Sequence, residues 1–213
     1  MMRKAFSDYE LYVFDVDGTL YDQPRLRLMM AMRLAGYYLC HPFRIRELVI
    51  LQHFRKVKDS WTGGSAEEDI IARTASDMKT DNEKVGAVVK KWIYDSPCDV
   101  IKKTADAKLI KLIKDLREKG RKVVVLSDYP AKDKLDVLGV SVDGVYDPDD
   151  ERIDELKPSS KGLKVIMEDT GAKPCDILMI GDRMEKDGSC AEGVNADFLI
   201  LPRRVGKRTY NEI

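Results

Sequence analysis

Two aspartates one residue apart, Asp15 and Asp17, follow a short apolar segment and are themselves followed by Gly18 and Thr19. The apolar segment, residues 11–14, has β-branched and aromatic members, which favours a strand buried on both faces of a parallel sheet. Carboxylates just past the carboxyl end of such a strand lie where open α/β sheets bind ligands. Two close carboxylates repel each other unless a cation such as Mg²⁺ or a shared proton relieves them. The alternative is an ordinary Asp-Gly turn with both acids solvated.

Polar residues also follow the later strands that the sequence predicts. They are Ser127 and Asp128 after residues 121–126, Lys157 before a proline and a capped helix, and Asp182 and Asp187 after residues 176–180. In a parallel sheet the carboxyl ends of the strands meet at one edge. We therefore expect four acids, including Asp15 and Asp17, to gather there with one hydroxyl and one lysine.

This set of groups has the chemistry that phosphoryl transfer needs. One carboxylate can attack phosphorus and form an aspartyl-phosphate. A metal ion and a lysine can neutralise charge on the transferring oxygens, and a serine hydroxyl with backbone N–H groups can hold the non-bridging oxygens. A second carboxylate can protonate the leaving oxygen and then activate water. Each piece alone is ambiguous, because a Lys-Pro pair commonly begins a helix and a serine commonly ends a strand.

The elements that must position these residues alternate along most of the chain. Strands are predicted at residues 11–14, 121–126, 144–146, 176–180 and 196–201, with helices between them. This alternation predicts an α/β fold with a doubly wound, mostly parallel, Rossmann-like sheet. Residues 22–98 carry helical patterns and no strand pattern. We therefore expect residues 1–21 and 99–213 to form the α/β core domain, and residues 22–98 to be an inserted helical domain beside the sheet.

Local signals predict where several helices begin and end. Within the insertion, helices are expected at about residues 25–40, 43–58, 65–79 and 81–95, the third opened by a capping box of Ser65 and Glu68. Thr104 is expected to cap a helix that reaches Lys119, and Ser159 or Ser160 to cap one that ends near Gly171. The polar tail, residues 203–213, is expected to be loosely held.

Composition narrows the classes of function. The 213 residues include 37 basic and 37 acidic ones, and this balance argues against a nucleic-acid or membrane partner. No apolar run could span a bilayer and no signal-like segment opens the chain, so a cytoplasmic protein is expected. The four cysteines are far apart and are expected to be buried or partly buried thiols. The two histidines lack metal-site spacing.

The residues at the sheet edge resemble the four motifs of the haloacid dehalogenase (HAD) superfamily. Residues 14–20, Phe-Asp-Val-Asp-Gly-Thr-Leu, look like the first and most specific motif. Ser127 resembles the second, Lys157 the third, and Asp182 with Asp187 the fourth. The helical segment 22–98 stands where this superfamily inserts a C1-type cap, although only its position and helicity match.

The resemblance implies a role for each of these residues. Asp15 is similar to the nucleophile, and Asp17 resembles the general acid/base whose backbone carbonyl also binds the metal. Lys157 would steady the nucleophile as the third catalytic residue, while Ser127, with Thr19 and Asp128, would contact the substrate. Mg²⁺ would be held by Asp15, Asp17, Asp182 and Asp187. Asp187 would hold metal-bound water or orient Lys157, and Glu185 is a competitor for this last role. Asp128 departs from the asparagine common in the second motif, and would either repel an anionic substrate or cap the following helix.

Asp17 favours one reaction among those of the superfamily. Dehalogenases resemble the phosphatases but lack this second acid, because halide leaves without a proton. The expected function is therefore Mg²⁺-dependent hydrolysis of a small phosphorylated molecule through an aspartyl-phosphate on Asp15. A phosphotransferase or mutase, a dehalogenase-type enzyme and a non-catalytic HAD-fold binding protein are the alternatives. The chain is expected to be a monomer or a homodimer.

Specificity is expected to reside in the helical insertion. Arg25 and Arg27 are candidates to meet a second anionic group of the substrate, against the alternative of solvated helix residues. The glycine-rich segment 61–64 is a candidate for a loop that approaches the ligand, against a plain inter-helix turn. Nothing in the sequence marks a lysine of the insertion, such as Lys56 or Lys58, as reactive.

Overall fold

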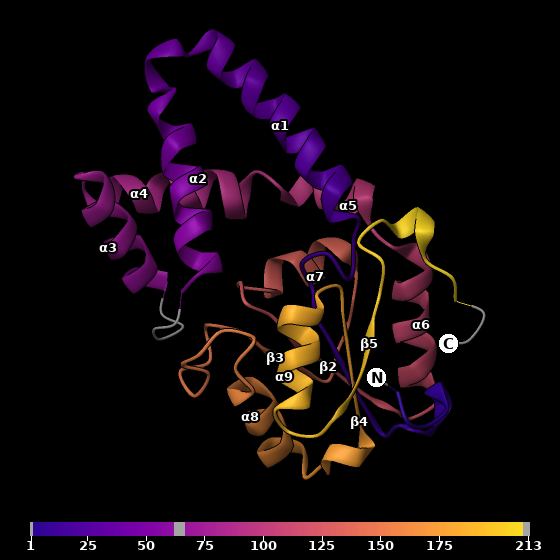
Figure 1. Cartoon of the computed structure of the whole chain (residues 1–213). Helices are drawn as coiled ribbons and strands as arrows, with labels where there is room; N and C mark the ends of the chain where they lie inside the picture. Colours follow the sequence, from indigo (N-terminus) through magenta and orange to yellow (C-terminus); the bar gives the residue numbers. More distant parts are fainter. Residues whose placement is uncertain (1, 62–66, 211–213) are drawn as a thin grey trace.

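A computed structural model describes residues 2–61 and 67–210 of the chain. Within them, five strands form one parallel sheet in the order β3-β2-β1-β4-β5 (Figure 1). The strands are β1 (Leu11–Phe14), β2 (Lys122–Leu126), β3 (Gly144–Tyr146), β4 (Ile177–Gly181) and β5 (Asp197–Ile200). The central strand β1 pairs with β2 and β4, so that Leu11 lies opposite Lys122 and Ile177. The predicted fold class is confirmed, and the strand ends differ from the predicted ones by no more than one residue.

A run of helices separates β1 from the rest of the sheet. It comprises α1 (Gln23–Cys40), α2 (Arg46–Asp59), α3 (Glu67–Met78), α4 (Asn82–Val89) and α5 (Cys98–Thr104), with a π-helical turn at Lys90–Asp95. Figure 1 shows α1 to α4 to one side of the sheet. Asp22 begins α1 by accepting a hydrogen bond from the N–H of Arg25. The predicted capping box cannot be compared, because Ser65 lies outside the described residues.

The helix that returns the chain to the sheet begins later than the sequence suggested. α6 (Ala107–Glu118) is capped by Asp106, which accepts a hydrogen bond of 3.1 Å from the N–H of Leu109. Thr104 instead ends α5, where its hydroxyl donates to the carbonyl of Ile101. The prediction that Thr104 caps this helix was therefore wrong. The helix is interrupted by an isolated β-bridge between Tyr21 and Ala105. This bridge joins the two segments that connect the helical run to the sheet.

The remaining helices are α7 (Lys132–Leu138), α8 (Lys161–Thr170) and α9 (Ser189–Glu192). Ser160 precedes α8, but its hydroxyl donates to the carbonyl of Cys190 and does not cap the helix. Ser159 is the serine whose hydroxyl accepts from the first N–H of α8, at 3.2 Å. Cys98 and Cys190 are partly buried and buried thiols as predicted, whereas Cys40 and Cys175 are exposed.

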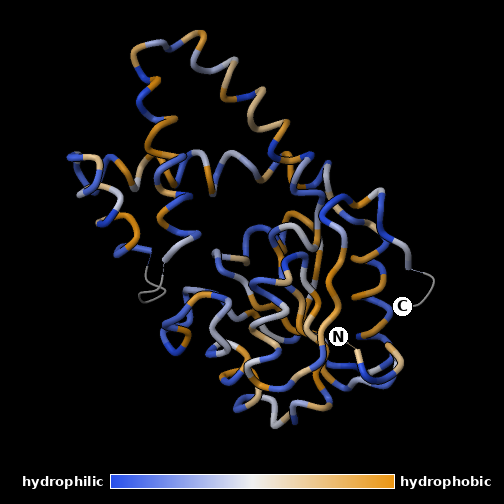
Figure 2. The backbone as a smooth tube through the Cα atoms, in the orientation of Figure 1, coloured by the Kyte–Doolittle hydropathy of each residue, from blue (hydrophilic) through white to orange (hydrophobic). Residues whose placement is uncertain are grey.

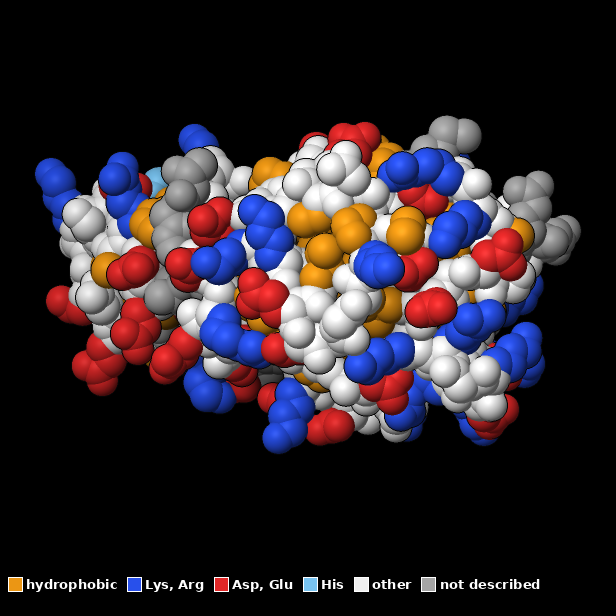
Figure 3. All heavy atoms as spheres, turned by 90° about the horizontal axis from the view of Figure 1, so that it is seen from below, with side chains coloured by type: hydrophobic (Ala, Val, Ile, Leu, Met, Phe, Trp, Pro, Cys, Tyr) orange, Lys and Arg blue, Asp and Glu red, His pale blue; other side chains and the backbone are white. Residues whose placement is uncertain are grey.

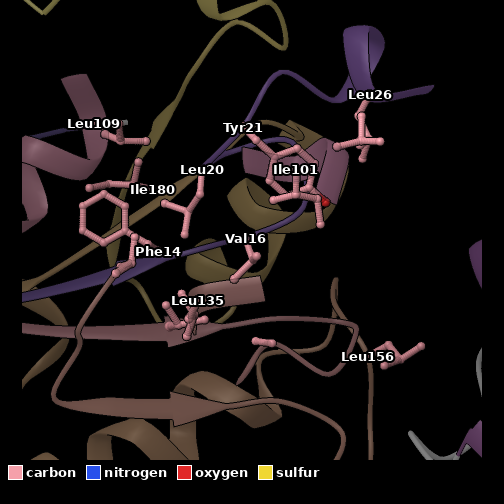
Figure 4. Close-up of a cluster of buried hydrophobic side chains, with 14 of the residues drawn as sticks. Phe14, Val16, Leu20, Tyr21, Leu26, Ile101, Leu109, Leu135, Leu156 and Ile180 are labelled. Carbon is pink, nitrogen blue, oxygen red and sulfur yellow. The ribbon is translucent and has the colours of Figure 1, made fainter. Parts of the chain in front are cut away.

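Hydrophobic residues concentrate on the central strands and are buried from both faces (Figure 2). Along β1, Tyr12 and Phe14 contribute to one core cluster, while Leu11 and Val13 contribute to the other. This alternation follows from the two-residue period of a strand. Figure 4 shows part of the first cluster, in which Val16 lies close to Leu20 and Leu135. Val16 therefore anchors the loop that carries the two leading aspartates.

The tail beyond β5 is held in place, contrary to the expectation. The buried guanidinium of Arg208 donates to the carbonyls of Gly18 and Thr19, each at 2.6 Å, and to Asp106 at 2.8 Å. The prediction of a loose tail was wrong for residues 203–210, because the sequence gives no sign that this arginine reaches the first motif. Residues 211–213 lie outside the described part.

The surface agrees with the balanced composition. Acidic and basic side chains are interspersed on the face seen in Figure 3. In the described part of the chain, no helix combines the length and apolar character that crossing a bilayer would require.

Candidate active site

Asp15 continues the hydrogen-bond ladder of β1 and then leaves it. Its N–H donates to the carbonyl of Ile180 at 2.8 Å, and its side chain is almost fully buried at the sheet edge. The hydroxyl of Thr19 donates to Asp15 Oδ2 at 2.9 Å, and Lys157 Nζ donates to Asp15 Oδ1 at 2.6 Å. Both carboxylate oxygens are therefore oriented. Thr19 was predicted to contact substrate, but it is fully buried and its hydroxyl contacts Asp15 in this structure.

Lys157 connects the first and last motifs. Its Nζ donates to Asp187 Oδ1 at 2.7 Å as well as to Asp15, and the side chain is 4% exposed. Asp187 Oδ2 in turn accepts from the N–H groups of Asp182 and Arg183. Glu185 is exposed and pairs with Arg183 at 3.0 Å. Asp187, and not Glu185, is therefore the acid that orients the lysine.

Asp15, Asp182 and Asp187 form a buried acidic cluster whose ligand atoms lie within 4.8 Å of one another. Asp182 Oδ2 is buried and makes no hydrogen bond with the described residues, and its ion partner Arg203 is 3.4 Å away. Burial and the nearby Asp187 raise the pKa of Asp182. Three buried carboxylates with one lysine between them are an oxygen-rich site short of positive charge, so the residues fit a hard divalent cation.

Two glycines permit this close approach. A Cβ on Gly18 would lie 2.6 Å from Asp182 Oδ2, and Gly18 also has a φ of +104°, which side chains rarely adopt. A Cβ on Gly181 would lie 2.2 Å from the carboxyl group of Asp187. The glycines of the first and fourth motifs therefore make room for the acids of the cluster.

The same environment acts on the protonation of Asp15 and Lys157. Burial raises the pKa of Asp15, Lys157 opposes this shift, and the Asp187 and Asp17 carboxylates add to it. Burial lowers the pKa of Lys157, but Asp15 and Asp187 outweigh that effect and hold the pKa well above its usual value. Lys157 is therefore charged, and additional positive charge at the cluster would favour ionised Asp15.

Asp17 stands apart from the acidic cluster. Lys134, from α7, donates to both of its carboxylate oxygens at 2.7 Å, and the hydroxyl of Tyr21 donates to Oδ1. The Asp17 side chain is therefore not one of the clustered ligands; the predicted metal contact through its backbone carbonyl stays a prediction. Sequence reasoning missed Lys134 and Tyr21. Tyr21 is only four residues after Asp17, but no motif marks it.

The second motif lies beside Lys157. Ser127 is buried and its Oγ accepts from the N–H of Tyr129 at 3.2 Å. Asp128 accepts from the N–H of Lys157 at 2.9 Å and from Lys186 Nζ at 2.8 Å. Burial raises the pKa of Asp128, but the two lysines outweigh it and the pKa is lowered. Asp128 therefore does not cap α7, which excludes one of the two alternatives considered for it, and two lysines lie beside its charge.

A cavity of about 210 Å³ opens over these groups, which suits a small molecule. Its floor is formed by the sheet edge, including Asp15, Asp17 and Lys157. Its other walls come from the helical segment, including Leu26, Met30 and Lys58. Of the two arginines considered for specificity, Arg27 lines the cavity. Arg25 is exposed and is not among the lining residues.

Comparison with solved structures supports the fold. The protein YfnB from Bacillus subtilis, solved with bound magnesium, superposes with a TM-score of 0.62 at 14% identity, covering 91% of this chain and 88% of that one. L-2-haloacid dehalogenase from Xanthobacter autotrophicus gives 0.59 at 16%, covering 91% and 77%. A HAD phosphatase from Thermococcus onnurineus gives 0.54 at 17%, covering 95% and 90%. A comparison with curated protein sequences finds no significant match.

The parallel sheet, its strand order and the cavity at its carboxyl edge define a Rossmann-like α/β fold of the HAD type. The family model described as haloacid dehalogenase-like hydrolase matches residues 9–194, which is most of the chain. The chain therefore belongs to this family of hydrolases, and it is an enzyme of the HAD superfamily.

Proposed function

We propose that the chain is a Mg²⁺-dependent phosphatase that hydrolyses small phosphomonoesters through an aspartyl-phosphate on Asp15. The observation that carries the proposal is the pair of acids on one loop with different partners. Asp15 is buried and held by Lys157 and Thr19, while Asp17 is held separately by Lys134. Two carboxylates in distinct environments can take the two roles that phosphoester hydrolysis requires.

Asp15, Asp17 and Lys157 have different roles in the proposed reaction. A carboxylate oxygen of Asp15 attacks phosphorus, and the bond to the leaving oxygen breaks while Asp17 donates a proton to that oxygen. Asp17 then takes a proton from water, and the resulting hydroxide attacks the acyl-phosphate to release phosphate and regenerate Asp15. Lys157 stays beside Asp15 throughout and balances charge on the transferring oxygens.

Mg²⁺ fits the same site, and we assign it to Asp15, Asp182 and Asp187 with the backbone carbonyl of Asp17. The observation that supports this assignment is the buried Oδ2 of Asp182, which accepts no hydrogen bond from the described residues. When bound, the cation would neutralise charge that develops on the phosphoryl oxygens. The helices between residues 22 and 98 are proposed to act as a cap domain that excludes water and selects the substrate.

Neighbours of this fold differ in their chemistry, so Asp17 is the discriminating residue. They include a phosphatase from Thermococcus onnurineus and an L-2-haloacid dehalogenase from Xanthobacter autotrophicus. A halide leaves without a proton, so a general acid placed two residues after the nucleophile favours phosphoester hydrolysis.

The test is an assay of purified protein against sugar, nucleotide and small-acid phosphates and against 2-chloropropionate, with Mg²⁺ and with EDTA. We expect phosphate release that needs Mg²⁺ and no release of chloride. Asp15→Asn should lower kcat/KM by about a thousandfold or more, because the nucleophile is removed. Asp136→Asn, an exposed acid on α7, is the matched control and should change nothing. Phosphate release by Asp15→Asn, or release unaffected by EDTA, would contradict the proposal. Analysis of products by phosphorus NMR separates hydrolysis from transfer to a second substrate.

A further inference from the structure

The cationic side chains that line the cavity differ in whether an acidic side chain contacts them. The lysines on the sheet side each contact a carboxylate within 2.8 Å: Lys157 contacts Asp15 and Asp187, Lys134 contacts Asp17, and Lys186 contacts Asp128. Each of these cations is therefore already matched before a substrate arrives.

The helical side of the cavity differs. Arg27 of α1 and Arg55 and Lys58 of α2 also line it. None of these three side chains forms an ion pair or a hydrogen bond with any residue of the described ranges 2–61 and 67–210. Figure 1 shows α2 running from the outer turn after α1 back toward the sheet, which brings its C-terminal end over the site. Three cations without an ion pair in the described ranges thus line the helical side of the cavity.

Lys58 is the most informative of the three because it is buried. It is 3% exposed, yet its Nζ has no hydrogen-bond partner among the described residues. The amine lies 3.8 Å from the centre of the Tyr129 ring, a cation–π contact that compensates only part of the lost hydration. Burial lowers the pKa of Lys58 to about 8, and Glu67 and Asp128 oppose this shift from beyond ion-pair distance. An anionic ligand would supply the missing partner.

We propose that Lys58, with Arg27 and Arg55, binds a second anionic group of the substrate. The substrate class is then a small phosphomonoester that carries a carboxylate or a second phosphate away from the scissile bond. This inference rests on the proposed phosphatase function for the reaction at the acidic end of the cavity. A single phosphoryl group there is served by Lys157 and the proposed cation, so three further cations exceed what one phosphate needs.

Part of the cavity lining is apolar. Leu26, Met30 and Ile101 belong to it, and Figure 4 labels Leu26 and Ile101 within the first core cluster. Such a surface suits the carbon skeleton of a small substrate. Recognition of the second anionic group of the substrate therefore depends on charge, through Arg27, Arg55 and Lys58.

The inference is tested with alkyl phosphates of equal chain length that end in a methyl, a carboxylate or a phosphate group. We expect the wild type to prefer the substrates with charged ends. Comparison of the carboxylate end with the phosphate end shows which of the two anions the site binds better. Lys58→Met should reduce the ratio of kcat/KM between charged and methyl ends by roughly tenfold or more, the worth of one charge-assisted hydrogen bond. Arg55→Gln, at an exposed position that cannot compromise the core, should reduce the same ratio. Lys56→Met, exposed on the same helix, is the control and should preserve it.

Binding of the corresponding alkyl phosphonates, measured by calorimetry with Mg²⁺, separates this inference from the proposed reaction. If no ester is hydrolysed, the phosphatase proposal fails, but a preference for carboxylate-ended phosphonates that Lys58→Met loses still supports the second-anion site. Equal affinity for charged and methyl ends in the wild type, or an unchanged ratio in Lys58→Met and Arg55→Gln, would overturn it.

Discussion

Asp15 and Asp17 are separated by one residue but are held by different parts of the molecule. Asp15 is bound by Lys157, which precedes α8, whereas Asp17 is bound by Lys134 from α7 and by Tyr21. Val16 between them is fully buried, so it fixes the backbone while the two acids point elsewhere. Their separate roles in the proposed reaction therefore depend on residues far away in the sequence.

Replacing Lys134 by methionine should impair the chemical step more than substrate binding. The ion pair positions both oxygens of Asp17, and its loss frees the carboxylate to rotate. We expect kcat to fall by about tenfold to a hundredfold, with KM changed by less than about threefold, because misplacing an acid/base costs rate. Steady-state kinetics with Mg²⁺ check this, and Lys132→Met on the exposed face of α7 is the control. Partial recovery in Lys134→Arg would support positioning, whereas an unchanged kcat in Lys134→Met would refute it.

Lys58→Met should stabilise the fold at neutral pH. The pKa of Lys58 is lowered to about 8 in the folded state, against about 10.4 in an unfolded chain. Below pH 8 the lysine is charged in both the folded and the unfolded state, so the cost of burying the charge is fully present. As the pH rises from 8 to about 10.4, the unfolded state binds more protons than the folded state, so the stability of the wild type rises. We therefore expect Lys58→Met to raise the free energy of unfolding by about 1 to 3 kcal/mol at pH 7, with a smaller gain at pH 10. Urea unfolding at the two pH values tests this, and a loss of stability at pH 7 would contradict it.

The motif residues could be predicted from the sequence, but their partners could not. Asp15, Lys157, Asp182 and Asp187 gather as expected because strand ends in a parallel sheet share one edge. Lys134 and Lys186 were missed, since each is an ordinary lysine on a helical turn with no local signal. Lys58 did carry a signal: it falls on the buried stripe of α2, seven residues after Leu51 and four after Phe54. A lysine in an apolar stripe is a candidate for a functional role.

At the level of elements, sequence periodicity predicted the strands and most helices well. It failed where a tertiary contact decided the boundary, as at Asp106. This residue caps α6 and also binds Arg208 and Tyr210, so one carboxylate joins the start of a helix to the tail. No local pattern reports a partner about a hundred residues away.

Arg208→Met should destabilise the protein and disturb the first motif. The buried guanidinium satisfies the carbonyls of Gly18 and Thr19 and the carboxylate of Asp106. Without it these acceptors lose their donor, and we expect the free energy of unfolding to fall by about 3 to 5 kcal/mol. Denaturant unfolding followed by circular dichroism is the measurement. Arg204→Met, at an exposed position in the same tail, is the control. An equal decrease in the free energy of unfolding in both variants would contradict a stabilising role of the buried contacts of Arg208.

For the whole molecule, the acidic cluster concentrates more negative charge than Lys157 and Arg203 balance. The acidic cluster holds three buried carboxylates, while the surface and the total charge are balanced. Such a cluster costs stability until a cation joins it, so metal binding should be visible in the folding equilibrium without any assay of activity.

Mg²⁺ at 10 mM should raise the melting temperature of the wild type by about 3 to 10 °C relative to EDTA. This range corresponds to a dissociation constant well below the concentration used and to a domain of this size. Asp182→Asn should remove most of the shift, because it neutralises the carboxylate whose Oδ2 has no hydrogen bond in the described structure. The same variant in EDTA should melt higher than the wild type in EDTA, since one of the three repelling charges is gone. Asp136→Asn should behave as the wild type in both conditions. A shift that survives in Asp182→Asn would mean that Mg²⁺ binds elsewhere, and the assignment of the cluster as the metal site would then be wrong.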